Sequence, residues 1–396
     1  MLSGMATPCP PTLTRVDLRL LTMMCPLLAI AAPAVGQTVW PELEANDTPA
    51  TANLLNPMLP GDSVSGQTLG ASTTGTGAGN SADYFRITTQ APPQAASIAR
   101  YRLALTPGPT TVAMTIRGVT QLNGLIGTSE TAVQTSADVG GVRYVQWYGL
   151  GPEARTLLVR MTGQVGAPAY MATLTADPVQ VTDLGVFPPG PLTVTMTPAA
   201  PLVDGEVWVY TAAGVAVPGA GNDDAPAPLV TTTPRLNRTL PDGVYLLAVS
   251  DANLFNDQAS PPDDSRRNRS VVNTAGILGS SSAATGVNLG FVISTPGRTL
   301  NVAAVKTEAF GVLLYRFTIG VPGGCSPADV CGIGGPPTPA DGAITGDDFV
   351  AFINAFGAGG GLADITGIGG PPTPADGAVT GDDFVAFINA FADGCP

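Results

Sequence analysis

The feature that most constrains the fold is a 25-residue segment that occurs twice near the C-terminus. Gly332 to Phe356 and Gly367 to Phe391 differ only at Ile344 and Val379. In each copy an acidic pair is followed by Phe or Ile at i, i+3, i+4 and i+7, which is the spacing of one apolar helix face. A repeat this short does not bury an apolar face alone, so we predict two helices that pack against each other.

Acidic and hydroxyl residues precede each predicted helix in the order of a calcium-binding loop of the EF-hand type. Such a loop supplies oxygen ligands, with a glycine turn in the middle and a carboxylate that closes it. We therefore predict two Ca²⁺ sites, one in each copy. The predicted ligands are Asp329, Asp341, the Ala343 carbonyl, Thr345 and Asp348 in the first copy, and Asp364, Asp376, the Ala378 carbonyl, Thr380 and Asp383 in the second.

The front half of each predicted loop differs from the ordinary pattern. Eight extra residues separate Asp329 from Asp341, and the same insertion separates Asp364 from Asp376. Asp-Gly and Asp-Asp pairs are also typical of turns and helix caps. A role in turns and caps is therefore the alternative to calcium binding.

The same region carries most of the charge. The chain has a net charge of −13, and residues 321–396 contribute −9 of it, because they contain nine Asp and no Glu, Lys or Arg. Such an acidic region is either a solvated surface or a site for cations. The overall negative charge argues against a nucleic-acid partner, which needs a basic face.

Tandem loop–helix units closed by Asp348 and Asp383, where an EF-hand has Glu, resemble a dockerin module. The resemblance implies bound calcium and a partner that is a cohesin-like or cell-surface protein. The third loop position departs from the family's pattern, because Cys331 and Thr366 stand there.

Residues 38–320 show strand patterns and no helix-length amphipathic run. Apolar residues alternate with polar or small ones in Tyr101 to Leu105, Val112 to Ile116 and Leu192 to Met196, and denser apolar runs occur at Val207 to Tyr210, Val244 to Leu247 and Leu313 to Tyr315. Alternation buries one face of each strand, so we expect sheets packed face to face. A Pro-rich boundary near residue 178 then predicts a mainly β chain, with β-sandwich domains over 37–177 and 178–320 and a small α-helical calcium-loop module over 321–396.

Two motifs in the first predicted sandwich resemble the bacterial pre-peptidase C-terminal (PPC) family. Glu44 to Pro49 (EANDTP) is similar to the family's E-P-N-D-T opening, with Ala45 in place of the proline, and Asp83-Tyr84-Phe85 is similar to its D-Y-F strand. Residues 206–210, 222–224 and 240–245 are similar to later strands of the family. The resemblance implies secreted accessory β-sandwiches without a catalytic role.

The N-terminus has the layout of a secretory signal. Arg15 and Arg19 precede an apolar run from Leu20 to Ala32, and small residues follow. This pattern predicts a signal peptide over residues 1–36, an extracellular or cell-surface location, and no membrane span in the mature chain.

Three cysteines remain after the predicted cleavage, and export makes a disulfide permissible. Cys325 and Cys395 bracket the acidic region, and we predict that they pair. A Cys331–Cys395 bond is the competing assignment.

The chain contains no histidine, which excludes Ser-His-Asp and Cys-His catalysis and His-containing zinc sites. We therefore expect a secreted, non-catalytic surface or scaffold-associated protein, anchored through the C-terminal module. One alternative is a carboxylate-based, glycan-active hydrolase. The other is a carbohydrate-binding protein, which would need aromatic residues such as Trp147 or Trp208 on an exposed sheet face.

Three short polar segments in the second predicted sandwich carry no expected site. Asn222 to Asp224 and Pro262 to Asp264 are typical of turns, and a catalytic or calcium-binding role is the alternative. Ser265 to Arg269 is predicted to be a solvated basic loop.

Overall fold

The protein is mainly β, as the sequence predicts, with 49% of residues in strands and 10% in helices. The structure is a computed structural model. It describes residues 37–68, 80–92, 98–106, 112–164, 169–197, 203–225, 233–320, 326–332, 334–336, 340, 342–367, 369–371 and 376–394. The predicted signal peptide lies outside these residues.

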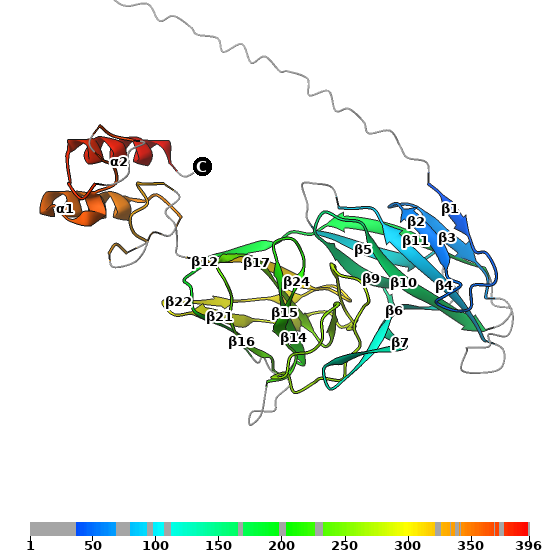
Figure 1. Ribbon diagram of the computed structural model, residues 1–396. Coiled ribbons are helices and arrows are strands. Elements are labelled where there is room, and N and C mark those ends of the chain that lie inside the picture. The colour runs from blue at the N-terminus through cyan, green and yellow to red at the C-terminus, as the bar shows by residue number, and fades with distance from the viewer. Residues whose placement is uncertain are drawn as a thin grey trace, which may run out of the picture. The chain divides into compact units, whose positions relative to one another are not determined.

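Two sheets share one hydrophobic core in the first half of the chain, and we call them the first sheet pair (Figure 1). One sheet has the order β1 (Val39–Pro41), β3 (Ser63–Gly66), β11 (Tyr170–Pro178), β5 (Ile98–Leu105), β9 (Val142–Leu150), β19 (Ile277–Ser280) and β18 (Leu254–Phe255), with β8 (Ala137–Val139) beside β9. The other has the order β2 (Asn53–Met58), β4 (Asn80–Thr89), β10 (Arg155–Gln164), β6 (Ala113–Leu122) and β7 (Leu125–Thr135).

A second sheet pair encloses a separate core. One sheet has the order β12 (Thr182–Phe187), β24 (Leu313–Ile319), β17 (Gly243–Asp251), β14 (Gly205–Thr211) and β15 (Ala216–Asn222). The facing sheet has the order β16 (Arg235–Thr239), β13 (Pro191–Met196), β21 (Phe291–Thr295) and β22 (Arg298–Val302), and a small ribbon is formed by β20 (Val287–Asn288) and β23 (Val305–Lys306).

The period-two pattern places side chains as predicted. In β5 the side chains of Tyr101, Leu103 and Leu105 are buried, and their neighbours along the strand are less covered. Trp147 and Trp208 are 0% and 1% exposed, and the Trp147 ring stacks on Tyr101 with centroids 5.7 Å apart. Both tryptophans are therefore core residues, and neither lines an exposed sheet face as the carbohydrate-binding alternative needs.

Strands from beyond residue 178 also join the first sheet pair. Leu278 of β19 pairs with Tyr148 of β9. A further bridge joins Val119 and Val271 through backbone N–H···O bonds of 2.8 and 3.0 Å. Leu254 of the same segment donates its N–H to Glu206 of β14 at 2.6 Å. The segment 254–280 therefore contacts both sheet pairs, and the domain boundary near 178 stays a prediction.

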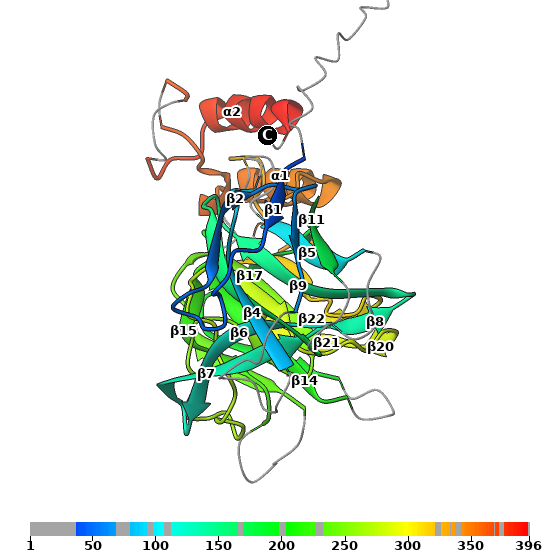
Figure 2. The same cartoon turned by 90° about the vertical axis from the view of Figure 1, so that its right-hand side faces the viewer.

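The two predicted helices are confirmed as α1 (Gly346–Ala358) and α2 (Gly381–Asp393), with the short 3₁₀ helix η1 (Gly361–Ala363) after α1. Figures 1 and 2 both show α1 beside α2. Phe352 and Phe387, at corresponding positions of the repeats, are fully buried and stack with ring centroids 3.8 Å apart. No described helix is long and apolar enough to cross a membrane.

Substituting Phe352 tests this packing. Phe352→Ala removes the central stacked ring and should destabilise the helix pair by about 3–5 kcal/mol, as expected for a buried Phe→Ala change. Phe349→Ala is the matched control, because Phe349 is 38% exposed and should cost much less. Amide hydrogen exchange of α1 and α2 measures both effects, and equal losses would contradict the packing described.

Candidate metal centre

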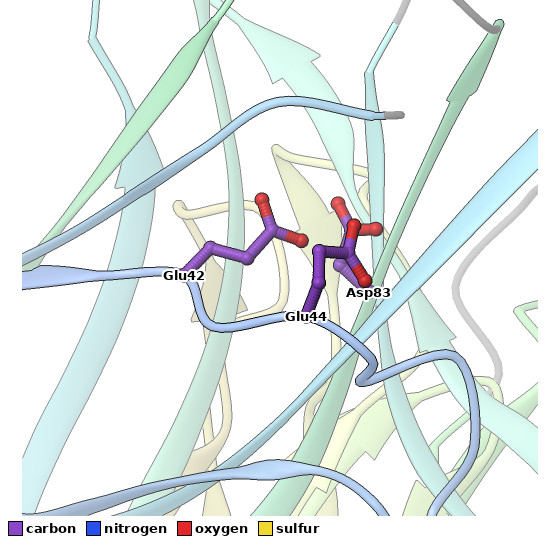
Figure 3. A group of neighbouring side chains, drawn as sticks. All are labelled: Glu42, Glu44 and Asp83. Atoms are coloured by element: carbon purple, nitrogen blue, oxygen red, sulfur yellow. The ribbon is translucent and has the colours of Figure 1, made fainter. Parts of the chain in front are cut away.

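Three carboxylates converge at one edge of the first sheet pair. Glu42 and Glu44 lie on the segment between β1 and β2, and Asp83 lies on β4. One oxygen of each lies within 4.8 Å of one oxygen of each of the others. Figure 3 shows the three side chains pointing toward one another. No sequence pattern predicts that these three residues meet, although Glu44 and Asp83 belong to the two motifs that resemble the PPC family.

Strand alternation places Asp83 between the two sheets. Asp83, Phe85 and Ile87 lie at alternate positions of β4, so their side chains are on the same face of the strand. Phe85 and Ile87 are core residues, and all three are 0% exposed. The Tyr170 hydroxyl of β11, in the opposite sheet, donates to Asp83 Oδ2 at 2.9 Å. The carboxylate therefore continues the core-facing row of β4 to the edge of the sheets.

Backbone and side-chain hydrogen bonds fix the segment that carries the two glutamates. Glu42 donates its N–H to the Ser65 carbonyl at 2.8 Å, and its Oε2 accepts the N–H of Gln67 at 2.8 Å. Asn53 holds the next residue, Leu43, by accepting its N–H at 2.9 Å and donating to its carbonyl at 2.8 Å. The two glutamates are thus held at defined positions beside β4.

Gly66 allows this close approach. A Cβ atom at position 66 would lie 2.3 Å from Glu42 Oε2 and 2.5 Å from the Tyr170 hydroxyl oxygen. Both distances are far below van der Waals contact, so a larger residue would push these oxygens apart.

Asn46 lies beside the group and contacts it through its amide nitrogen. The residue is 0% exposed, and its amide nitrogen donates to Glu42 Oε1 at 3.3 Å and to Asn53 Oδ1 at 3.2 Å. Its Oδ1 is buried and has no hydrogen-bond partner. A buried acceptor without a donor costs about 1–3 kcal/mol, so an additional partner at this position would stabilise the fold.

The electrostatics of the group favour a cation. Burial raises the pKa of Glu42 most, hydrogen bonds from Gln67 and Asn46 lower it, and the charge of Glu44 raises it again; the net shift is upward. Burial and the negative charge of Asp83 likewise raise the pKa of Tyr170. Among the described residues, no Lys or Arg forms an ion pair with Glu42 or Glu44.

Carboxylate and amide oxygens are the ligands of hard cations, and Ca²⁺ accepts them in flexible geometry at high coordination number. Glu42, Glu44 and Asp83 together fit that ligand set. Such an ion would offset the repulsion of the three carboxylates.

The closing aspartates of the predicted calcium loops are placed differently. Asp348 is 0% exposed, its Oδ1 accepts the N–H groups of Val330 and Cys331 at 2.9 Å each, and its Oδ2 accepts the N–H and hydroxyl of Thr345 at 2.8 and 3.0 Å. Burial raises the pKa of Asp348, but these hydrogen bonds outweigh it and hold the pKa below its usual range.

Asp383 repeats the arrangement in the second copy. It accepts hydrogen bonds from the N–H groups of Ile365, Thr366 and Thr380 and from the Thr380 hydroxyl. A carboxylate has about four acceptor positions, so in this geometry donors occupy all of them. Asp348 and Asp383 act here as helix caps that also hold the loop, and coordination of an ion by either would replace hydrogen bonds.

The remaining predicted ligands lie in the loops before the helices. Asp329 accepts the Gly342 N–H at 2.8 Å, and Asp364 accepts the N–H groups of Asp376 and Gly377 at 3.2 and 2.6 Å. Asp341 lies outside the described residues, and Ala343 and Ala378 lie in the turns that lead to Thr345 and Thr380. In the second copy, where all three predicted carboxylates are described, they do not meet within 4.8 Å as the Glu42 group does. The two C-terminal calcium sites stay predictions.

The predicted disulfide cannot be placed, because Cys325 and Cys395 both lie outside the described residues. Cys331 is a buried free thiol, so the competing Cys331–Cys395 bond is not formed in the structure. Burial, followed by the charge of Asp348, raises the pKa of this thiol to about 11.

In comparisons with known proteins, no family model and no curated protein matches this chain. The resemblances to dockerins and to the PPC family therefore rest on the motifs quoted above.

Glu44→Gln tests the metal centre by an effect that changes sign with calcium. In EDTA the substitution removes one of three like charges and should stabilise the fold by about 1 kcal/mol. In calcium it removes a ligand, so it should reduce the stabilisation by the ion, which for one site is about 2.7 kcal/mol at one hundred times the Kd. Thermal unfolding of the full chain in both conditions measures the two effects.

Glu153→Gln is the matched control, because Glu153 is 75% exposed and lies outside the group. Glu153→Gln should change neither the stability in EDTA nor the stabilisation by calcium. A Glu44→Gln chain that loses the same stability in EDTA and in calcium would contradict the metal centre.

Asp383→Asn tests the cap. An amide would turn an NH₂ group toward N–H donors, so we expect a loss of about 1–3 kcal/mol in EDTA, where calcium plays no part. The neighbouring Asp382 is exposed and its carboxylate accepts the N–H of Gly369, so Asp382→Asn is the control and should cost less. Hydrogen exchange of α2 gives both values, and equal losses would contradict the cap.

Proposed function

We propose that this chain is a non-catalytic, calcium-stabilised β-sandwich protein that is exported and attached to a scaffold or a cell surface through its C-terminal helices. The observation that carries the proposal is the convergence of Glu42, Glu44 and Asp83. Extracellular calcium would hold the segment between β1 and β2 against β4. The absence of histidine from the sequence supports a role without acid–base chemistry.

The surface of the helix pair supports the attachment role. Val350 and Val385, at corresponding positions of the repeats, are each 57% exposed, and Ile353 and Ile388 are each 37% exposed. Residues three apart are neighbours on a helix surface, so each helix carries two adjacent exposed apolar side chains, and adjacent apolar side chains are what a protein-binding patch needs. Because the positions are duplicated, each helix offers the same face to a partner.

The attachment is tested with the full chain and the envelope fraction of the cells that produce it. Replacing Val350 and Val385 together by Glu places charges on both faces, and we expect at least a tenfold loss of binding, equivalent to about 1.4 kcal/mol. Val305→Glu is the control, since Val305 is 51% exposed on β23, outside the helices. Binding is measured in calcium and in EDTA.

Two outcomes separate the parts of the proposal. Unchanged binding by the double variant would exclude the helix faces as the attachment surface. Equal thermal stability of the wild-type chain in calcium and in EDTA would exclude calcium stabilisation and leave the attachment result standing.

A further inference from the structure

A second acidic group lies in the second sheet pair, far along the chain from the Glu42 group. Asp204 immediately precedes β14, and Asp223 and Asp224 immediately follow β15. One carboxylate oxygen of each lies within 4.8 Å of one oxygen of each of the others. Pairing of β14 with β15 brings the two ends together, because Val207 is opposite Asn222.

The buried oxygens of this group lack hydrogen-bond donors. Asp223 is 0% exposed, and neither of its two carboxylate oxygens has a hydrogen-bond partner. One buried oxygen of Asp204 and one of Asp224 also have none. Each buried acceptor without a donor costs about 1–3 kcal/mol, and more when it is charged. Among the described residues, no N–H or O–H donates a hydrogen bond to these four oxygens, so a cation can coordinate them without replacing one.

Neighbouring arginines compensate only part of the charge. Arg266 approaches Asp204 at 3.4 Å and Asp223 at 3.6 Å, and Arg269 lies 3.8 Å from Asp223. Arg269 is already paired with Glu206 and Asp264, which are both 0% exposed. The five carboxylates of Asp204, Glu206, Asp223, Asp224 and Asp264 are thus balanced by only the two guanidinium groups of Arg266 and Arg269. Burial, followed by the charges of Asp204 and Asp264, raises the pKa of Asp223 to about 8.

We propose that Asp204, Asp223 and Asp224 bind one Ca²⁺ ion. A group made only of carboxylate oxygens suits a hard cation, and Ca²⁺ tolerates irregular geometry and completes its shell with water. A divalent ion would offset most of the surplus negative charge and coordinate the oxygens that lack donors. The site shares no residue with the Glu42 group and does not depend on the proposed function.

The ion would also fix a segment that reaches the first sheet pair. The Asp224 carbonyl accepts the Ser265 N–H at 3.3 Å, and the Asp224 N–H donates to Asp264 at 3.4 Å. Two residues on, the Arg267 carbonyl accepts the N–H of Gly124 at 2.9 Å, at the turn between β6 and β7. Calcium at Asp224 would therefore stabilise residues 264–271, which join the two sheet pairs.

The test uses the full chain and the double variant Asp204→Asn/Asp224→Asn. Both residues are partly exposed, so the amides should be accommodated, and fully buried Asp223 is kept. Equilibrium dialysis against calcium should show one bound ion fewer per chain than in the wild type. In the wild type, calcium at one hundred times the Kd should slow amide exchange of residues 264–271 by about 100-fold, and in the variant it should not.

Two comparisons make the result specific. Asp263→Asn changes a neighbouring carboxylate that pairs with Arg238 outside the group, so it should keep both the bound ion and the protection. Glu42→Gln/Glu44→Gln should lose a different ion and leave the exchange of residues 264–271 unchanged. If the Asp204/Asp224 variant binds as many ions as the wild type and shows the same calcium-dependent protection, the site does not exist. If the double variant misfolds, the single variant Asp224→Asn is measured in the same way, and unchanged ion binding and protection in it would likewise exclude the site.

Discussion

The two sheet pairs are joined by a buried apolar cluster that includes Tyr148 of β9 and Trp208 of β14, and beside it by the buried ion pairs of Arg269. Its side chain is 4% exposed and lies against Glu206 at the start of β14 and Asp264 in the long segment after β18. Removing one member would leave a buried charge without its counterpart, which is far more costly than losing an exposed pair. The same segment continues to Val271, which bridges Val119 of β6. The Arg269 guanidinium group thus fixes one part of the chain that crosses from one core to the other, and backbone hydrogen bonds such as Gly124 N–H to the Arg267 carbonyl fix another.

Each acidic group contains a fully buried carboxylate that a strand fixes in place. Asp83 lies in the core-facing row of β4, and Asp223 follows the last residue of β15. At such places a side chain is partly removed from water while the strand still fixes its position. A charge at such a place is costly without a partner, and its fixed position makes it a good ligand for an ion. This combination favours ion binding beside a strand over ion binding in an exposed loop.

Periodicity explains how much of the fold could be predicted from the sequence. The strands around Leu103 and Val194 and the helices around Phe352 and Phe387 follow from patterns within a few residues. The acidic groups do not, because strand pairing brings together residues that are distant in sequence. Ser265 to Arg269 was predicted to be solvated from its charge, and this is wrong for Arg269, which buried carboxylates surround. Likewise Asn222 to Asp224 has the composition of a turn, and only the fold shows that Asp223 is buried.

The two repeats are related by an approximate two-fold axis, as matched ring distances show. Phe349 lies 6.2 Å from Phe387, and its counterpart Phe384 lies 6.4 Å from Phe352. The contact is therefore isologous, like the interface of a symmetric dimer, except that one polypeptide supplies both halves. A dimer of single repeats would separate on dilution, whereas the covalent link keeps the effective concentration of the second half high. Because both halves lie on one chain, the packing of the two helices does not depend on protein concentration.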